Sequence, residues 1–276
     1  MNNVKDSFLI SVIVSTYNRH DALQLVLEGL VGQDDRNFEV IISDDGSDER
    51  TRAVIDSFRE KAPQLKFEHC WQKHEGFRLA AVRNRGVRAA AGEYLIFLDG
   101  DCVPPPNFVS THRRLASRKA LVVGQRVLTS RELADQLVSG KRLINWSLQA
   151  FLKWQREGGV NRVSPLLHFE WPVLRRLFSF SPKSIRGCNF ALWKYDYEEV
   201  NGCDENFVGW GHEDLDLAQR LFNNKVRILS GNFASFVLHL WHAPQSRQAA
   251  EANMEMAVNS KKNARVKAND LRKPNQ

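Results

Sequence analysis

The sequence predicts an α/β protein built on a doubly wound, mostly parallel sheet. Its first hundred residues alternate short apolar runs with segments of helical periodicity, which is the pattern of repeated βαβ units. Several of the apolar runs stop abruptly at polar residues, as strands do at the ligand-binding edge of such a sheet. The runs that we expect to form strands here are residues 8–15, 38–43, 65–70 and 94–98.

Each helix between these strands has a recognisable start. Asp21 is expected to cap the first helix, and Ser47 or Asp48 the second. Residues 79–91, rich in Ala and Arg, are expected to form a third helix that leads into the strand at 94–98. This last strand is apolar throughout, so we expect it to be buried on both faces.

The alternation becomes less regular after Pro106. We expect further strands at 121–128, 185–193, 226–229 and 237–242, a helix over 133–154 and another that begins near 217. Residues 155–185 are irregular, aromatic and basic, so they are either core-packing residues or a mobile acceptor flap or membrane-contacting patch. The chain from 246 onward is a basic tail with strong helix formers.

Composition narrows the class of protein. The chain has 276 residues, a net charge of +7 and four cysteines without CxxC spacing, which argues against structural zinc and a disulfide framework. No stretch is long and apolar enough for a transmembrane helix, and no signal peptide is evident, so we expect a cytoplasmic protein. The positive charge suits a diphosphate substrate or an anionic membrane surface. No nucleic-acid-binding motif is present, so we expect no nucleic-acid partner.

Two carboxylates follow the 94–98 strand directly. Asp99 and Asp101 are separated only by Gly100 and are followed by three prolines. Carboxylates at the end of a buried strand need a partner, and for an Asp-x-Asp pair the usual partner is a hard divalent cation. A turn or helix-cap aspartate would account for only one of them.

Four segments in order carry a family resemblance. They are Ser15–Arg19 (STYNR), Ser43–Ser47 (SDDGS), Gly76–Gly86 and Phe97–Asp101 (FLDGD). Together they resemble family 2 glycosyltransferases of the GT-A fold. The later segment GWGHEDLD, residues 209–216, resembles the C-terminal half shared by β-1,4-galactosyltransferases and bacterial chondroitin-polymerase-type domains. The resemblance covers about residues 8–245, except roughly 130–183.

The resemblance implies a metal site. In the family the second Asp of the Asp-x-Asp motif binds the metal, which makes Asp101 the ligand here. His242, with His239 as a further candidate, stands where the galactosyltransferases complete the site. The implied cofactor is Mn²⁺ or Mg²⁺, and imidazole ligands favour Mn²⁺. Ordinary surface or core histidines remain the alternative.

The resemblance also assigns residues to a UDP-sugar donor. Asp44 matches the carboxylate that contacts uracil, although it could instead be a turn aspartate. Asp99 would contact the ribose or act through water. Lining residues and cations near the donor are implied at Thr16, Tyr17, Arg19, Arg78 and Arg83. Arg78 and Arg83 point in different directions on a helix, and we favour Arg78 as the one that reaches phosphate.

Proton chemistry is assigned to the downstream motif. Inverting transfer needs a base that takes the acceptor hydroxyl proton, and Asp214 occupies that motif position, with Glu213 beside it binding sugar hydroxyls. Trp210 offers a flat face for a sugar ring, and Gly211 and His212 complete the expected acceptor loop. Asp216 is expected at the start of a helix, stabilised by the helix dipole.

The sequence thus predicts an inverting, metal-dependent glycosyltransferase acting on a glycan or lipid-linked glycan, such as a bacterial lipopolysaccharide core or surface polysaccharide. It would contact an anionic membrane peripherally, at the inner face of the plasma membrane. The alternatives are a sugar-phosphate nucleotidyltransferase and a non-catalytic carbohydrate- or polyanion-binding protein. The expected divisions are a nucleotide-sugar half (1–125), a variable insertion (126–185), an acceptor and base half (186–245) and a basic helical tail (246–276).

Overall fold

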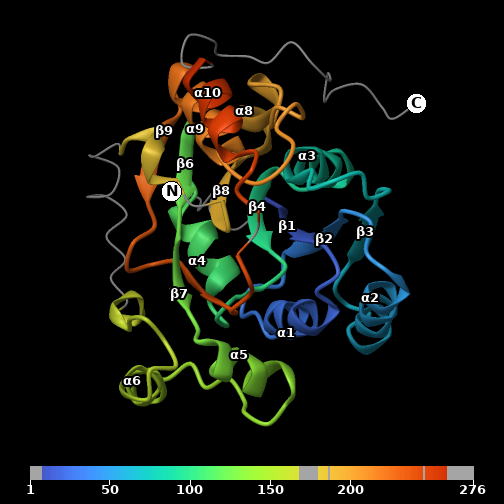
Figure 1. Cartoon of the computed structure of the whole chain (residues 1–276), viewed down its shortest axis with the longest axis vertical. Coiled ribbons are helices and arrows are strands. Elements are labelled where there is room, and N and C mark those ends of the chain that lie inside the picture. Colours follow the sequence, from blue (N-terminus) through green and yellow to red (C-terminus); the bar gives the residue numbers. More distant parts are fainter. Residues whose placement is uncertain (1–7, 168–179, 186, 245, 260–276) are drawn as a thin grey trace.

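A seven-stranded sheet in the order β3-β2-β1-β4-β8-β6-β9 forms the centre of the fold, and a three-stranded sheet, β5-β10-β7, lies beside it (Figure 1). This computed structural model describes residues 8–167, 180–185, 187–244 and 246–259. The strands are β1 (Ile10–Thr16), β2 (Phe38–Asp44), β3 (Phe67–Trp71), β4 (Tyr94–Asp99), β5 (Cys102–Val103), β6 (Ala120–Val123), β7 (Gln125–Leu128), β8 (Asn189–Trp193), β9 (Arg227–Ser230) and β10 (Phe236–His239).

Strand direction confirms the predicted sheet. β3, β2, β1 and β4 run parallel, and β6 runs parallel to β9, whereas β8 is antiparallel to both β4 and β6. In the register, Ser15 lies opposite both Ser43 and Asp99. The polar loops after β1, β2 and β4 therefore leave the sheet at one edge, where open α/β sheets bind ligands.

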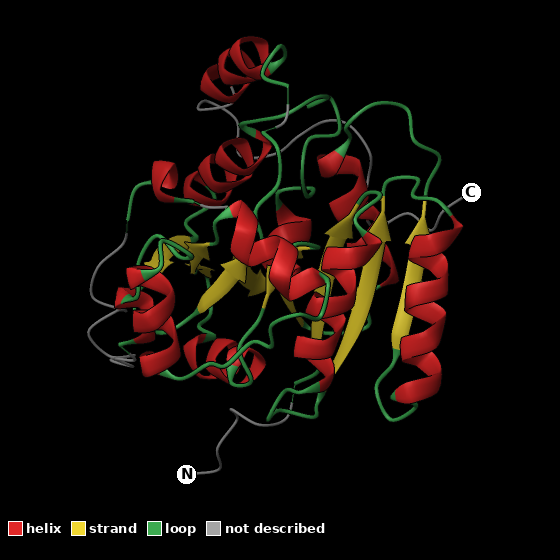
Figure 2. Ribbon diagram, turned by 60° about the horizontal axis from the view of Figure 1, so that its bottom comes forward, coloured by secondary structure: helices red, strands yellow, loops and turns green. Residues whose placement is uncertain are grey.

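Helices cover both faces of the central sheet (Figure 2). The helices are α1 (His20–Val31), α2 (Glu49–Lys61), α3 (Leu79–Ala89), α4 (Phe108–Leu115), α5 (Arg131–Val138), α6 (Leu148–Arg156), α8 (Lys194–Glu199), α9 (Glu213–Asn223) and α10 (Ala250–Asn259). One large apolar core joins the sheet to α1, α2, α4, α5 and α6, and a second joins it to α3, α8, α9 and α10. A small third cluster joins β6 and β9 to the end of α4. This two-layer covering explains why β1, β2 and β4 are almost wholly buried.

Several local predictions need correction. The helix expected over 133–154 is two helices, because Gly140 takes a left-handed φ of +70° after α5 and Ser147 caps α6 through Ala150 N–H. The strand expected over 121–128 divides at Gly124, where a side chain would clash with Asn189. The strand expected over 185–193 begins only at Asn189.

Helix starts were predicted with mixed success. Asp48 caps α2 by accepting Arg50 N–H, as expected. Asp21 is not the cap of α1: the helix begins at His20, and Asp21 lies in its first turn and accepts a hydrogen bond from Arg19 Nε. Its carboxylate interacts favourably with the positive end of the helix dipole, but it does not cap the helix.

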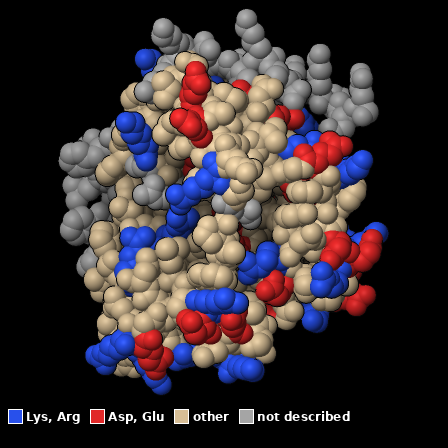
Figure 3. Space-filling view, in the orientation of Figure 1, with Lys and Arg blue, Asp and Glu red and all other residues tan. Residues whose placement is uncertain are grey.

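Two further expectations concern membrane-spanning helices and the aromatic and basic segments. Within the described ranges, no helix combines the length and the apolarity that crossing a bilayer requires. Residues 168–179 of the aromatic segment and 260–276 of the tail lie outside the described residues. On the face drawn in Figure 3, Lys and Arg occur near the middle, and they alternate with Asp and Glu toward the lower and right margins.

Candidate active site

Asp101 and two histidines meet at the edge of the small sheet. β5 pairs antiparallel with β10 so that Cys102 lies opposite His239, and Leu240 N–H donates to the Asp101 carbonyl. Nε2 of His239 lies 3.3 Å from Asp101 Oδ1, and Nε2 of His242 lies 3.6 Å from Oδ2. The structure therefore brings together the three metal ligands that the resemblance implied.

This donor set suits a divalent metal. Ligand atoms on adjacent corners of an octahedron with bonds of about 2.1 Å lie about 3 Å apart, close to the distance of each histidine from Asp101. Among the described residues, ligand atoms of Asp101, Cys102 and His239 all lie within 4.8 Å of one another. Burial would raise the pKa of Asp101, but its hydrogen bond to His239 and the charges of both histidines hold that pKa below its ordinary value. Burial raises the pKa of the Cys102 thiol well above normal. The hard carboxylate and the borderline imidazoles are therefore the available ligands, a set compatible with Mn²⁺ or Mg²⁺.

Arg83 connects the Asp-x-Asp motif to the start of α9. The guanidinium, which is 1% exposed, lies 3.5 Å from Asp99 Oδ1 and 3.2 Å from Glu213 Oε1. Burial and the neighbouring Asp214 raise the pKa of Glu213 to about 7, although Arg83 opposes that shift. Burial likewise raises the pKa of Asp99, again against the charge of Arg83.

A strained loop presents the α9 carboxylates. Gly209, Gly211 and His212 all have positive φ, and Gly209 N–H donates to the carbonyl of Phe77, just before α3. Glu213 is buried behind this loop, and Asp214 Oδ2 accepts the Gly187 N–H at 3.0 Å. The helix cap is His212, without a side-chain bond, so neither carboxylate serves as the helix N-cap.

Trp210, on the same loop, is 40% exposed. The guanidinium of Arg247 lies 5.5 Å from the centre of its ring. Helix α10 packs behind the loop, and Asn253 donates to the carbonyl of Val208. Asp216 lies in the first turn of α9, as expected, and it is also buried and paired with Arg220 at 2.6 Å.

The loops after β1 and β2 form the other end of the site. Thr16 pairs with Asp44 in the register of the two strands. Asp44 is 1% exposed; its Oδ1 accepts the Ser47 N–H at 2.8 Å, and its Oδ2 lies 2.9 Å from His69 Nε2. Asp44 thus stabilises the turn after β2, and its contacts with Ser47 and His69 fix the orientation of its carboxylate.

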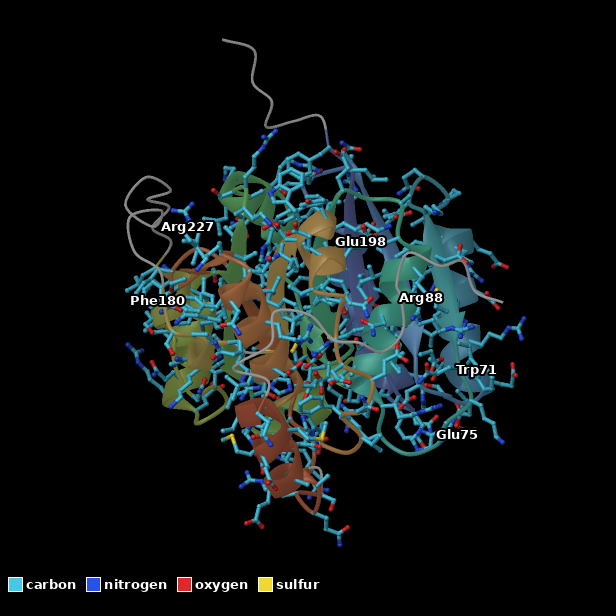
Figure 4. All side chains as sticks on the ribbon, turned by 90° about the horizontal axis from the view of Figure 1, so that it is seen from above. Trp71, Glu75, Arg88, Phe180, Glu198 and Arg227 are labelled. Carbon is cyan, nitrogen blue, oxygen red and sulfur yellow. The ribbon has the colours of Figure 1, made fainter. Side chains whose placement is uncertain are left out.

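The ring of Tyr17 stacks on that of His74, with centroids 4.1 Å apart. Trp71, the last residue of β3, and Glu75, which follows it in the next loop, are labelled near each other in Figure 4. Arg19 pairs with Asp21 at 3.2 Å, and its charge also acts on Asp101. A flat aromatic surface therefore lies next to the carboxylates of the β2 loop.

The two arginines of the third helical segment have separate surroundings. Arg78 pairs with Glu75 at 3.1 Å and donates to the carbonyl of Lys73. Arg83, and not the favoured Arg78, lies beside Asp99. The expectation that the two point in different directions agrees with these contacts.

Several residues of this region were not singled out from the sequence. His69 lies in the middle of β3, His74 in the loop after it, and Gly187 in the loop before β8. Arg126 on β7 acts electrostatically on Asp99. Their only sequence signal was proximity to predicted strand ends, which many other polar residues share.

The fold and this arrangement of carboxylates, histidines and arginines define a glycosyltransferase of the GT-A type. The chain belongs to glycosyltransferase family 2: the model described as "Glycosyl transferase family 2" matches residues 11–166, more than half of the chain. A second model, described as the N-terminal domain of galactosyltransferase, matches residues 177–243. Both halves of the predicted resemblance are thereby confirmed.

Curated relatives agree with this assignment. Over 77% of its own length, the present chain is 31% identical to a chondroitin synthase of Escherichia coli. Over 77% of its length it is also 31% identical to a validoxylamine A glucosyltransferase of Streptomyces hygroscopicus subsp. limoneus. It spans 32% of the first protein and 48% of the second, so both are considerably longer.

Solved structures share the fold at low identity. S. aureus TarS residues 1–349 in complex with UDP matches with a TM-score of 0.64 and 17% identity, covering 95% of this chain and 67% of that one. A mannosyltransferase from Pyrobaculum calidifontis, solved with GDP-Man and Mn²⁺, matches with a TM-score of 0.58 and 18% identity, covering 84% and 57%.

Proposed function

We propose that this chain transfers a sugar from a UDP-sugar to a glycan acceptor with inversion of configuration, using a divalent metal ion. The observation that carries the proposal is the meeting of Asp101 with His239 and His242. Its companion is the second carboxylate pair, Glu213 and Asp214, which Arg83 joins to Asp99. In an inverting transfer of this kind, a cation site balances the charge of the leaving diphosphate and a separate base takes the acceptor proton.

Asp101, His239 and His242 would hold the metal ion, either Mn²⁺ or Mg²⁺. When bound, this ion supplies Lewis-acid neutralisation of the donor diphosphate. Asp99 would orient the ribose directly or through water. In the loops after β1 and β2, Thr16, Tyr17, Arg19 and Asp44 would bind the nucleoside, with the Tyr17–His74 stack offering a flat apolar surface.

Asp214 would take the proton from the acceptor hydroxyl. Its carboxylate accepts hydrogen bonds from the N–H groups of Gly187 and Leu215, which fix its orientation. Trp210, with Gly211 and His212 on the same loop, would bind the acceptor sugar. One displacement, with the base and the leaving diphosphate on opposite sides of the donor sugar, inverts the anomeric centre.

The acceptor that we propose is a bacterial envelope glycan, either a lipopolysaccharide core or another surface polysaccharide. The likeness to chondroitin synthases supports a glycan acceptor. The basic tail, with seven Lys or Arg over 247–273, would bring the enzyme to an anionic membrane. Deleting residues 260–276 should reduce membrane association and cell-surface glycan, and unchanged levels of both would refute this assignment.

A donor screen tests the central proposal. Hydrolysis and transfer would be measured with Mn²⁺ and each of UDP-Glc, UDP-Gal, UDP-GlcNAc and UDP-GalNAc, with GDP-Man as the test of base preference. We expect turnover of one UDP-sugar, lost in Asp101→Ala and in EDTA but retained in Asp135→Ala, a matched change on exposed α5. Pyrophosphate-dependent turnover would instead indicate a nucleotidyltransferase, and no turnover with any donor would refute the proposal.

A further inference from the structure

Arg83 contacts carboxylates that belong to opposite ends of the site. Its Nη1 lies 3.2 Å from Glu213 Oε1, and its Nη2 lies 3.5 Å from Asp99 Oδ1. The same Nη2 donates to the carbonyl of Gly187 at 2.8 Å. One side chain on α3 therefore joins the end of β4, the loop before β8 and the start of α9.

The peptide group of Gly187 extends this connection to Asp214. Its carbonyl accepts from Arg83, and its N–H donates to Asp214 Oδ2 at 3.0 Å. A Cβ atom at residue 187 would lie 3.0 Å from Arg83 Nη2 and 3.1 Å from Asp214 Oδ2. A side chain at this position would push the guanidinium and the carboxylate away from the backbone by a few tenths of an ångström.

Burial makes Arg83 a poor ligand for a donor phosphate. The side chain is 1% exposed, and its guanidinium lies 5.5 Å from the centre of the Phe190 ring. A phosphate could reach it only by displacing Asp99 or Glu213. Guanidinium is suited to the alternative role, because its planar fork can serve several acceptors at once while lysine ammonium is a point charge.

We propose that Arg83 and the Gly187 peptide form a positioning frame, which holds Glu213 and Asp214 in register with Asp99. This inference rests on the proposed function, in which those carboxylates bind substrate and take the proton. It replaces the phosphate contact that the sequence suggested for Arg83. Arg83 is then a positioning residue, whose loss misplaces the base while the metal ligands and the nucleoside loops after β1 and β2 keep their own contacts.

The frame predicts a specific kinetic signature. Arg83→Met keeps the apolar stem and removes the bridging charge, so Asp99 and Glu213 lose their common partner. Because displacing a reacting group by about 1 Å can cost about 100-fold in rate, we expect kcat to fall at least about 100-fold. The donor KM and the dissociation constant for UDP with Mn²⁺ should rise by no more than about threefold, since the frame contacts the nucleotide site only through Asp99 and does not contact the metal ligands.

Three further variants complete the test. Arg83→Lys retains the charge without the fork and should recover only part of kcat. Gly187→Ala leaves every charge in place and should lower kcat in the same selective way. Arg88→Met is the matched control, because Arg88 lies on the same helix, pairs with Glu205 at 3.3 Å and is labelled at the outer side of α3 in Figure 4; its kcat should match the wild type.

A structural readout keeps the frame testable without turnover. The crystal structure of Arg83→Met should show the carboxylates of Glu213 and Asp214 displaced by about 1 Å, and that of Gly187→Ala should show Asp214 and the Arg83 guanidinium displaced by a few tenths of an ångström. Unmoved carboxylates would overturn the frame, as would a UDP–Mn²⁺ affinity that falls about tenfold or more while kcat is retained. If Arg83→Met does not fold, Arg83→Lys and Gly187→Ala still decide. Absence of turnover in the wild type would refute the proposed function, while the crystal structures would still judge the frame.

Discussion

The buried His112 should make the stability of this protein fall in mild acid. His112 is completely buried on α4, and its Nε2 lies 3.1 Å from Asn189 Oδ1 and 2.8 Å from Ser235 Oγ. Its Nδ1 has no hydrogen-bond partner in the described part of the chain. A proton added to the ring would place an N–H group in an apolar site without an acceptor, which is costly.

The size of this effect follows from the pKa. Burial lowers the pKa of His112 from 6.5 to about 4. Between these values the unfolded chain binds a proton that the folded chain does not, so stability is complete above pH 6.5 and falls as the pH drops toward 4. The linkage relation gives a loss of about 2 kcal/mol between pH 7.5 and pH 5, and about 3 kcal/mol below pH 4.

Urea denaturation at pH 7.5, 6 and 5 would measure this loss. Other groups titrate in the same range, so the informative quantity is the difference between the wild type and His112→Gln, which cannot take up the proton. We expect His112→Gln to be less stable at pH 7.5 but to lose about 2 kcal/mol less than the wild type by pH 5. Parallel pH profiles for the two proteins would refute the reasoning.

Three other predictions concern single positions. Gly46→Ala should weaken UDP binding, measured by calorimetry, by about tenfold, because the added Cβ would lie 2.4 Å from the backbone nitrogen of His74. Gly140→Ala is the control, because Gly140 also has a positive φ but an added Cβ there would meet no neighbouring atom. Asp216→Asn should lower the free energy of unfolding by about 3 kcal/mol or more, since it leaves Arg220 buried without its counter-ion, and a loss below about 1 kcal/mol in urea would contradict this. His212→Gly should raise the free energy of unfolding by about 1 kcal/mol, because His212 has a φ of +71°; an unchanged urea midpoint would show that no strain is relieved.

The central sheet was predictable because its signals are local. Each of β1, β2 and β4 contains at least three consecutive apolar residues, and a run of that kind can be recognised without reference to the rest of the chain. The smaller strands have no such signal. β5 comprises only Cys102 and Val103, and its pairing with β10 depends on two segments far apart in the sequence.

In the candidate site, too, residues with a local sequence signal could be predicted, whereas contacts between distant segments could not. Asp99 and Asp101 could be recognised from the strand that precedes them, and Glu213 and Asp214 from their motif. The approach of His239 to Asp101 depends on the β5–β10 pairing, which residue spacing alone could not establish. The bridging role of Arg83 was equally hidden, because its partners lie on β4 and α9 and a helical arginine resembles any solvated one in sequence.

The antiparallel position of β8 has a consequence for biosynthesis. β4 is apolar on both faces and pairs with β1 on one side and with β8 on the other. β8 is synthesised only after α4, β6, β7, α5 and α6. While those segments are being synthesised, one edge of the hydrophobic strand β4 is therefore unpaired in the nascent chain. A fragment ending at residue 125 should therefore self-associate through the free edge of β4. The yield of the folded full-length chain should depend on how quickly β8 pairs with that edge.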